Sequence, residues 1–557
     1  MNISLAFFFE WLIILAIADI TIQYPAESQE GATMTLHIPG QGSIVGGYGT
    51  TLWSERTFMQ FLGIPYAESP REELRFKLAV KRKPWTQILN TSNYGRRCPS
   101  LSSINKIQND QIKDDLEDCL NLCVYTKDLD VRRPVMFYVY GGGFFNGSNE
   151  DHPPGFLLEK DIVLVVPNYR IGALGFLSLG NEDIPGNVPI GDLTLALQWV
   201  QDYIQYFGGD AKQVTVFGQS AGAAMLGALL LSPKTPSGLF HRSIIQSGSI
   251  ISSWGVRKDY IRQIKRLCYT LACGQCTNNS EIYTCVRNVS VGKLLESTKS
   301  ESFGPVLGDY YGYIPQEPLE LHKEKKNSVP LMTGFTKHDG SFVLAIYYDG
   351  WKKQLPNLSN VTVRQFANGL FRMINDNGGI ANNLLMKLLF PKDIWQSDQH
   401  EKALAAYFDV TNIAFMKSPT VTFAQKMLEK HSAPVYLYSF DYDGSNTRFG
   451  YGFGHEHYPF SGGIHHSNEN IYLFPTHLLN DDDKKIAQKM VDLWTSFVIN
   501  GKPQTKDSPE ILPMEDELGP YFHIDTNITL GYNVLDELSA TVDDPEHEKL
   551  HRKHIKF

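Results

Sequence analysis

The sequence has 557 residues, of which 42% are hydrophobic and 20% are charged, the balance of a globular protein with a large core. Its formal net charge of -9 gives no reason to expect nucleic acid or an anionic membrane surface as a partner. The length could hold two or three average domains, but no composition break, internal repeat or Pro/Ser-rich linker marks a boundary.

The first residues have the features of a secretory signal peptide. An apolar stretch over residues 5–16 leads to Ala16-Ile17-Ala18, a small-residue cleavage pattern. We therefore predict removal of residues 1–18 and a single secreted domain over residues 19–557. The alternative is a buried N-terminal segment, because no Lys or Arg precedes the apolar stretch and Glu10 interrupts it. No other window is long enough for a membrane span, so we expect the mature protein to have none.

Strand-like and helical patterns alternate along the rest of the chain. Short apolar runs predict strands over residues 135–139, 162–166, 214–217, 242–246, 329–333 and 435–440. Helical periodicity predicts helices over residues 192–207, 221–231 and 481–499. Three aspartates begin the last helix, where they suit the positive end of the helix dipole better than a metal site. The alternation predicts an α/β architecture, with a mostly parallel central sheet and helices on both faces.

The segment VTVFGQSAGAAMLG, residues 214–227, places Ser220 between a predicted strand and a predicted helix. Glycine permits the sharp turn that such a junction needs, and the turn presents the serine hydroxyl as a nucleophile. The G-x-S-x-G pattern alone is weak, and a plain tight turn is the alternative. Its position between strand and helix favours a nucleophile elbow.

A serine nucleophile needs donors for the oxyanion that forms on the attacked carbonyl. The segment YVYGGGFFNG, residues 138–147, follows a predicted strand and could supply the backbone N–H groups of Gly142 and Gly143. The N–H group of Ala221 would be a third donor. The alternatives are a flexible loop and a phosphate-binding loop, but the Lys-Ser or Lys-Thr of a phosphate-binding loop does not follow.

The serine also needs an acid–base pair. In a hydrolase of this architecture the acid follows a later strand, and the histidine comes later again. Asp339, in GFTKHDGSF after the strand at 329–333, is the candidate acid. Candidate bases follow the strand at 435–440: His455, His457, His465 and His466. Such a cluster could bind a metal, but the ligands of a regular site are not spaced to join it, so we expect no metal.

Cysteines and glycosylation sequons agree with secretion. The seven cysteines are Cys98, Cys119, Cys123, Cys268, Cys273, Cys276 and Cys285, and their odd number leaves at least one thiol free or paired between chains. A C-x-x-C pair at 273–276 lacks the second pair or nearby histidines of a zinc site. Sequons begin at Asn90, Asn278, Asn288, Asn357, Asn360 and Asn527. A further sequon begins at Asn146, where its place in the glycine-rich loop makes us doubt a glycan.

Together these motifs resemble those of the type-B carboxylesterases, the family that includes cholinesterases and insect juvenile hormone esterases. The resemblance covers nearly all of the mature chain. It is carried by FLGIPYAESPREELRF (61–76), EDCLNLCVYT (117–126), YGGGFF (140–145), FGGDAKQVTVFGQSAG (207–222), HRSIIQSGS (241–249) and LWTSFVINGKP (493–503). It implies an α/β-hydrolase fold and a serine esterase that requires no cofactor.

The resemblance implies roles for the candidate residues. The family's Gly-x-x-His-x-x-Glu motif falls on Gly463, His466 and Glu469, so His466 is the base. The family's acid falls on Asp339, and because most members carry Glu there, a small loop shift must bring the shorter Asp within reach. Ser247 falls on a serine behind the triad.

The resemblance also implies a pocket. Trp254 falls on an acyl-pocket tryptophan of the family. With Tyr140, Phe144 and Phe145 it suggests aromatic walls that suit an apolar carboxylic ester.

The family's cysteines imply two disulfides in this chain. Cys98 would pair with Cys119, and Cys285 would pair with Cys276 or Cys273. No cysteine follows Cys285, so the third disulfide of the cholinesterases cannot form.

Two further residues depart from the cholinesterase pattern. The acidic residue usual before the nucleophile is Gln219 here, as in juvenile hormone esterases, and Asn109 stands where cholinesterases hold their choline-binding tryptophan. Without that aromatic face, cation–π binding of a quaternary ammonium is undercut. With the missing disulfide, these departures argue against an acetylcholinesterase.

We therefore expect a secreted serine carboxylesterase that hydrolyses small apolar esters through an acyl-enzyme. The chief alternative is a non-catalytic adhesion protein of the same family, against which the intact serine, acid and histidine argue. A third interpretation is a slow, tight binder of hydrophobic esters, whose turnover is incidental. The sequence specifies neither the preferred ester nor the oligomeric state.

Overall fold

The computed structural model describes residues 32–101, 116–324, 328–354, 361–374, 379–430, 433–450 and 457–552. The predicted signal peptide lies outside these ranges. So do the expectations placed on Asn109, Asn357, Asn360 and His455.

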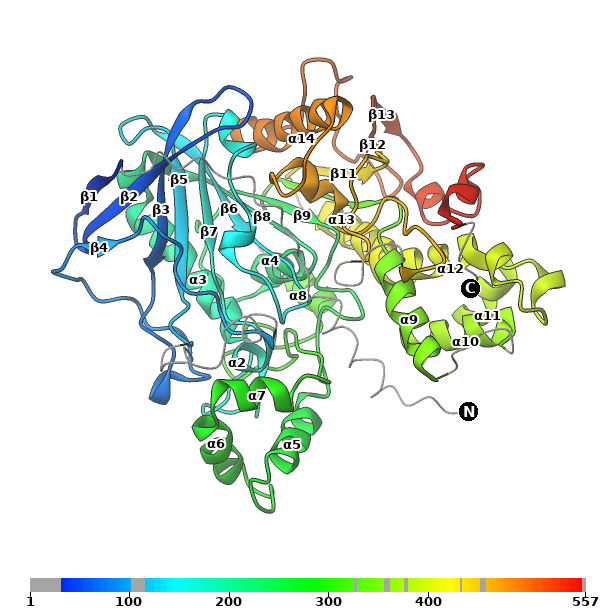
Figure 1. The fold of residues 1–557 in the computed structure, drawn as a ribbon, viewed down its shortest axis with the longest axis horizontal. Coiled ribbons are helices and arrows are strands. Elements are labelled where there is room, and N and C mark those ends of the chain that lie inside the picture. The colour runs from blue at the N-terminus through cyan, green and yellow to red at the C-terminus, as the bar shows by residue number, and fades with distance from the viewer. Residues whose placement is uncertain are drawn as a thin grey trace.

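A large, mostly parallel sheet forms the centre of the molecule (Figure 1). Its strands are β1 (Met34–Ile38), β2 (Gly42–Thr50), β3 (Thr57–Pro65), β4 (Leu89–Asn90), β5 (Asn121–Thr126), β6 (Arg133–Val139), β7 (Val163–Pro167), β8 (Gly209–Gln219), β9 (Arg242–Gln246), β10 (Leu331–Thr336), β11 (Val435–Phe440), β12 (Tyr521–Ile524) and β13 (Ile528–Gly531). They follow the order β1-β2-β3-β5-β7-β6-β8-β9-β10-β11-β12-β13, and β4 pairs with β2. Strands β7 to β12 in this order pair in parallel, whereas β1, β2, β3, β5 and β13 join through antiparallel pairs.

Helices follow most of the parallel strands and cover the sheet. They are α2 (Gly172–Phe176), α3 (Val188–Tyr203), α4 (Ala221–Leu231), α5 (Tyr260–Thr270), α6 (Asn279–Asn288), α7 (Val291–Ser297), α8 (Pro318–Glu324), α9 (Ser341–Gln354), α10 (Val363–Ile374), α11 (Gly379–Leu389), α12 (Leu404–Thr411), α13 (Ser418–Lys430) and α14 (Asp481–Asn500). Both α4 and α14 contact β6 and β8, and α13 contacts β10 and β11. The predicted α/β architecture, a mostly parallel sheet with helices on both faces, is therefore confirmed.

The structure contains the predicted strands and helices, with small differences in where some of them begin and end. Helix α4 and strands β9 and β11 have the predicted bounds. Helix α3 begins four residues earlier than expected, at Val188, because Pro189 fits the first helical turn, where its missing N–H costs no hydrogen bond. Helix α14 begins at Asp481 as predicted, and the side chain of Asn480 caps it by accepting from the N–H groups of Asp482 and Asp483.

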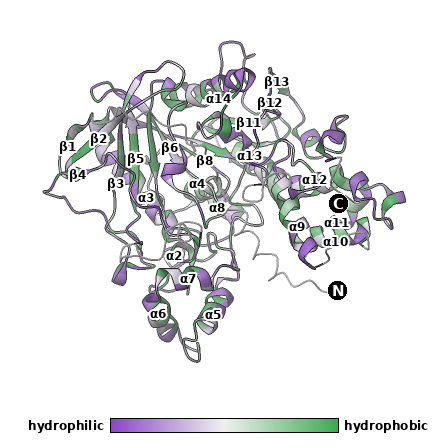
Figure 2. Ribbon diagram, in the orientation of Figure 1, coloured by the Kyte–Doolittle hydropathy of each residue, from purple (hydrophilic) through white to green (hydrophobic). Residues whose placement is uncertain are grey.

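The buried strands explain why the sequence reads as uninterrupted apolar runs. All residues of β7 and β10 are buried, as expected for parallel strands covered on both faces. Hydrophobic residues accordingly concentrate on the central strands and on helix α4 (Figure 2). A second hydrophobic cluster lies among α9, α10 and α12, to the right of the sheet in Figure 1.

The disulfides resolve one prediction and correct another. Cys98 bonds Cys119, as the family resemblance implied. Cys285 bonds Cys273, so the alternative pairing of Cys285 with Cys276 is wrong. Cys276 instead bonds Cys268, a pair that we did not predict. The reason is geometric: Cys268 lies in the last turn of α5, and the loop that follows returns Cys276 beside it. The remaining cysteine, Cys123, is a buried free thiol in β5.

Within the described ranges, no helix combines the length and the apolar character that crossing a membrane requires.

Candidate active site

Ser220 lies at a sharp turn between β8 and α4. Its backbone has φ 58° and ψ −125°, a region that non-glycine residues rarely occupy, so the turn is strained. Glycines let neighbouring backbone approach this turn. A Cβ at Gly218 would lie 2.7 Å from the carbonyl oxygen of Val139, and one at Gly248 would lie 2.5 Å from the carbonyl oxygen of Ser220. The glycine pattern that predicted an elbow thus has a steric cause.

The structure brings Ser220, His466 and Asp339 together. Ser220 Oγ lies 2.8 Å from His466 Nε2, and His466 Nδ1 lies 2.6 Å from Asp339 Oδ1. Asp339 is fully buried and His466 nearly so, whereas Ser220 is partly exposed. With Nδ1–H donating to the carboxylate, the Nε2 lone pair can accept the serine proton. The Ser220 hydroxyl is therefore partly accessible, while the hydrogen bond between His466 and Asp339 behind it is buried.

The loops that carry the acid and the histidine are joined to each other. Asp339 lies between β10 and α9, and His466 lies in the long segment after β11. The backbone N–H of His338 donates to the carbonyl oxygen of Ile464, and the N–H of Ile464 donates to His338 Nδ1 at 2.9 Å. Burial lowers the pKa of His338 to about 3, so its ring stays neutral and keeps this acceptor.

The glycine-rich loop lies directly after β6, next to the elbow. Gly142 and Gly143 have φ angles of 114° and 60°, which favour glycine. The carbonyl oxygen of Gly142 accepts from the N–H groups of Phe145 and Asn146, so the loop is a defined turn rather than a flexible segment. Ala221 is the first residue of α4, where an N–H has no carbonyl within its own helix. The oxyanion role of these three N–H groups remains a prediction.

Gln219 and Ser247 lie around the triad, as expected. Gln219 Nε2 lies 3.2 Å from His466 Nε2. Ser247 Oγ donates to Glu469 Oε1 at 3.2 Å. Burial, and then the nearby Asp339 carboxylate, raises the pKa of Glu469 to about 7. A second carboxyl group that can hold a proton near neutral pH therefore lies behind the triad.

A series of aromatic ring contacts leads to His466, but it does not include all the rings that were predicted. Trp254 contacts Phe144, with ring centroids 6.0 Å apart. Tyr140 is fully buried; its ring stacks on Tyr169 and its hydroxyl donates to Asn168 Oδ1, so its assignment to the pocket is wrong. A tyrosine directly after a buried strand belongs to the core because its hydroxyl finds a partner there.

Sequence reasoning missed two aromatic residues of the site. The Phe342 ring lies 4.8 Å from the His466 ring, and Phe415 lies between Phe342 and Trp254. Phe415 also accepts the indole N–H of Trp254 at its carbonyl oxygen. The position of Phe342, three residues after Asp339 at the start of a helix, was a signal that could have been used. Phe415 had no such signal.

The other predicted histidines lie apart from the reacting groups. His465 Nδ1 lies 2.7 Å from the carbonyl oxygen of His466, and burial lowers its pKa well below the ordinary value, so it is a neutral core residue. His457 pairs with Asp349 at 2.9 Å. Neither joins a cluster of metal ligands among the described residues.

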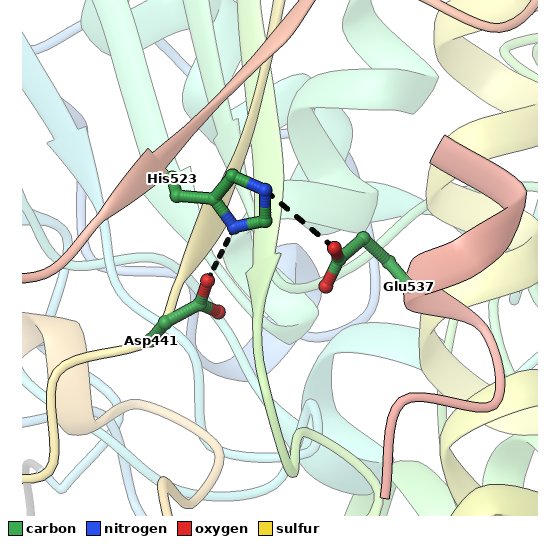
Figure 3. Close-up of side chains that lie close together, drawn as sticks. All are labelled: Asp441, His523 and Glu537. Carbon is green, nitrogen blue, oxygen red and sulfur yellow. Dashed lines mark hydrogen bonds and ion pairs between the residues drawn. The ribbon is translucent and has the colours of Figure 1, made fainter. Parts of the chain in front are cut away.

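A separate group of acidic and imidazole side chains lies at the carboxyl ends of β11 and β12 (Figure 3). Asp441 Oδ2 lies 2.5 Å from His523 Nδ1, and Glu537 Oε1 lies 3.6 Å from His523 Nε2. Each carboxylate lies near a different ring nitrogen of His523, and one potential ligand atom from each of the three residues lies within 4.8 Å of the other two. The hydrogen bond to Asp441 raises the pKa of His523 above its ordinary value.

The chain belongs to the carboxylesterase family, whose sequence model matches residues 32–542. This family of carboxylic ester hydrolases has the α/β-hydrolase fold, so the family resemblance drawn from the motifs is confirmed. The chain is 30% identical to esterase FE4 of Myzus persicae over 514 residues, which cover 88% of either chain. It is 31% identical to the acetylcholinesterase of Bungarus fasciatus over 472 residues, 80% of this chain and 75% of that one.

Glutactin of Drosophila melanogaster is a further relative, 27% identical over 532 residues. The alignment covers 90% of this chain and 50% of glutactin, so the chain spans half the length of that relative.

Proposed function

We propose that this protein is a secreted serine carboxylesterase whose nucleophile is Ser220. The observation that carries the proposal is the hydrogen-bonded series from Ser220 Oγ through His466 to Asp339, at 2.8 and 2.6 Å. Nucleophile, base and orienting acid at these distances are what acyl transfer through a serine requires. The family membership supports the same reaction class.

In the first half of the reaction, Ser220 Oγ attacks the ester carbonyl carbon while its proton passes to His466 Nε2. Asp339 holds the imidazole in the tautomer with Nδ1–H and stabilises the imidazolium that forms. The imidazolium then donates this proton to the alkoxy oxygen of the leaving group as its C–O bond breaks, and the alcohol departs and leaves an acyl-serine ester. In the second half, water attacks the acyl-serine carbonyl carbon while its proton passes to His466. The imidazolium then protonates Ser220 Oγ as the acyl C–O bond breaks, so the carboxylic acid leaves and both residues return to their starting state.

The oxyanion of each tetrahedral intermediate needs donors that are fixed before the reaction. Gly142, Gly143 and Ala221 are our candidates, because the turn that carries them abuts the elbow. A Cβ at Gly141 would meet Ser220 Cβ at 2.8 Å, which places this loop against the nucleophile. Loss of one such donor typically costs ~10²–10³ in kcat.

The substrate that we propose is an apolar, uncharged ester. Trp254, Phe144, Phe342 and Phe415 form an aromatic surface next to His466. The residue before the nucleophile is the neutral Gln219, so the site lacks at that position the negative charge that would favour a cationic substrate.

Three disulfides support an oxidising compartment, and we propose that the protein is extracellular. Four predicted glycosylation sites lie at exposed positions: Asn90, Asn278, Asn288 and Asn527. Ser148, the hydroxyl residue of the sequon at Asn146, is fully buried, which supports the absence of a glycan there.

Covalent labelling tests the nucleophile. Diisopropyl phosphorofluoridate transfers its phosphoryl group to an activated serine and releases fluoride, so we expect one adduct per chain, on the peptide that contains Ser220. Ser220→Ala should abolish the adduct, whereas Ser249→Ala, a buried serine two residues beyond Ser247, should not. Labelling that persists in Ser220→Ala would assign the reactive serine elsewhere, and no labelling of folded wild type would favour a non-catalytic family member.

A further inference from the structure

The amide side chain of Asn412 contacts the loop that carries Asp339 at two backbone positions. Asn412 Oδ1 accepts the backbone N–H of Gly340 at 2.6 Å, and Asn412 Nδ2 donates to the carbonyl oxygen of Lys337 at 3.4 Å. These two contacts lie on either side of Asp339 in the chain. Asn412 is fully buried, so water does not compete for them.

The loop also packs directly against the backbone that carries Asn412. A Cβ at Gly340 would lie 2.5 Å from the backbone nitrogen of Asn412, closer than any real side chain allows. Asn412 begins a π-helical segment, Asn412–Lys417, that joins α12 to α13. Such turns are rare and occur often at functional sites because they displace backbone from its regular helical path.

The amide makes a third contact, to the C-terminal part of the chain. Asn412 Nδ2 lies 3.5 Å from Thr541 Oγ1. The backbone N–H of Thr541 in turn donates to Asp409 Oδ1, one turn earlier on α12. The side chain of Asn412 is therefore fixed by three partners on two segments, the acid loop and the C-terminal part of the chain, and can define a position for the loop.

We propose that Asn412 is a positioning residue for Asp339. The inference rests on the proposed function, because it assigns Asn412 an effect only through the acid of the triad. The Asp carboxylate is shorter than Glu by one methylene, yet it lies 2.6 Å from His466 Nδ1. Asn412 holds the loop at the distance that this short side chain needs. A shift of about 1 Å in the position of a catalytic group can lower the rate ~10²-fold, even when the mutation that causes it lies far from the reacting atoms. Loss of the hydrogen bonds from Asn412 to the acid loop should therefore lower kcat.

A double-mutant cycle on an aryl acetate tests the inference. Asn412→Ala should lower kcat by about 10–100-fold with little change in KM, because ester binding does not involve this side chain. In the Asp339→Ala background, Asn412→Ala should cause no further loss of kcat, since the residue acts through the missing carboxylate. If Asn412→Ala does not fold, Asn412→Ser, which keeps a shorter polar side chain, replaces it in the same cycle.

Asn187→Ala is the matched control. Asn187 is also fully buried, and its amide donates to the carbonyl oxygen of Val306 and accepts the N–H of the same residue, away from the triad. It should lower the unfolding temperature and leave kcat within about 3-fold, since only a contact that positions reacting groups changes the rate.

The outcomes separate the inference from the function beneath it. The role of Asn412 alone would be overturned if the kcat of the double variant were reduced by the product of the two single reductions. It would also be overturned if Asn412→Ala kept the wild-type kcat while Asp339→Ala was inactive. Full activity in Ser220→Ala or Asp339→Ala would overturn the proposed triad, and the inference with it.

Discussion

Gln219 Nε2 lies 3.2 Å from His466 Nε2, the ring nitrogen that also faces Ser220 Oγ at 2.8 Å. Two donors therefore share one imidazole lone pair in the resting enzyme. Because the amide is neutral, it contributes no charge that would hold a proton on the ring.

Gln219→Glu should move the acidic limb of the kcat/KM profile to higher pH by about 1 unit. A carboxylate beside Nε2 stabilises the imidazolium, which cannot accept the serine proton. The measurement is kcat/KM for a neutral aryl ester from pH 5 to 9. Gln201→Glu, on α3 with its amide bonded to the carbonyl oxygens of Ala211 and Leu239, is the control and should leave the limb in place. An unshifted profile in Gln219→Glu would show that the amide has no electrostatic influence on the base.

His338→Leu should destabilise the protein by about 1–3 kcal/mol and lower kcat, because the N–H of Ile464 loses its acceptor in a buried site. His338→Asn restores an acceptor near the position of Nδ1 and should recover most of both losses. Urea unfolding and ester hydrolysis measure the two effects. Equal losses in both variants would mean that ring packing, rather than this hydrogen bond, joins the acid and histidine loops.

Glu469 should make a contribution to the stability of the fold that decreases as pH rises from about 4.5 to 7. Burial raises the pKa of Glu469 to about 7 from an ordinary value near 4.5, so between these values the folded state binds a proton that the unfolded state releases. The stabilisation is fully present below the pKa of Glu469 in the unfolded state and is lost as pH rises through its pKa in the folded state. The free energy of unfolding loses ~3 kcal/mol in total through this group. Urea unfolding at pH 5 and 7.5 gives the change in unfolding free energy between the two pH values, and this change should be more positive in Glu469→Gln than in wild type, because the variant lacks the contribution that falls with pH. Glu281→Gln, at an exposed position on α6, should keep the wild-type change; a wild-type change in Glu469→Gln would refute the assignment.

His523 should contribute stability of the same sign. Its hydrogen bond to Asp441 raises the pKa of His523 above 6.5, so the stabilisation is complete below that pH and lost as pH rises through the folded value. His523→Gln should therefore lower the unfolding temperature more at pH 6 than at pH 9. A loss of stability in His523→Gln that is independent of pH would indicate a packing role only.

The sequence indicated most of the elements that carry the site. Strand, glycine and serine patterns are local, so the elbow at Ser220 and the bounds of α4 were predictable. The histidine required the family motif, because four histidines lie in one loop and local pattern does not separate them. Tyr140 was assigned to the wrong environment, since the direction of a side chain after a strand depends on its partners across the sheet.

Contacts between distant segments could not be predicted in this way. Asn412 and Gly340 are 72 residues apart, and nothing near Asn412 in the sequence marks it as a partner of the acid loop. The pairing of Cys276 with Cys268 rather than Cys285 depends on how the loop after α5 returns, which spacing alone leaves open.

Hydrolysis of a short-chain aryl ester by wild type and by Ser220→Ala tests the central claim most directly. The account predicts turnover in wild type and a kcat at least about 10³-fold lower in Ser220→Ala, with unchanged folding. Equal activity in the two proteins would contradict it, because the elbow would then be only a turn.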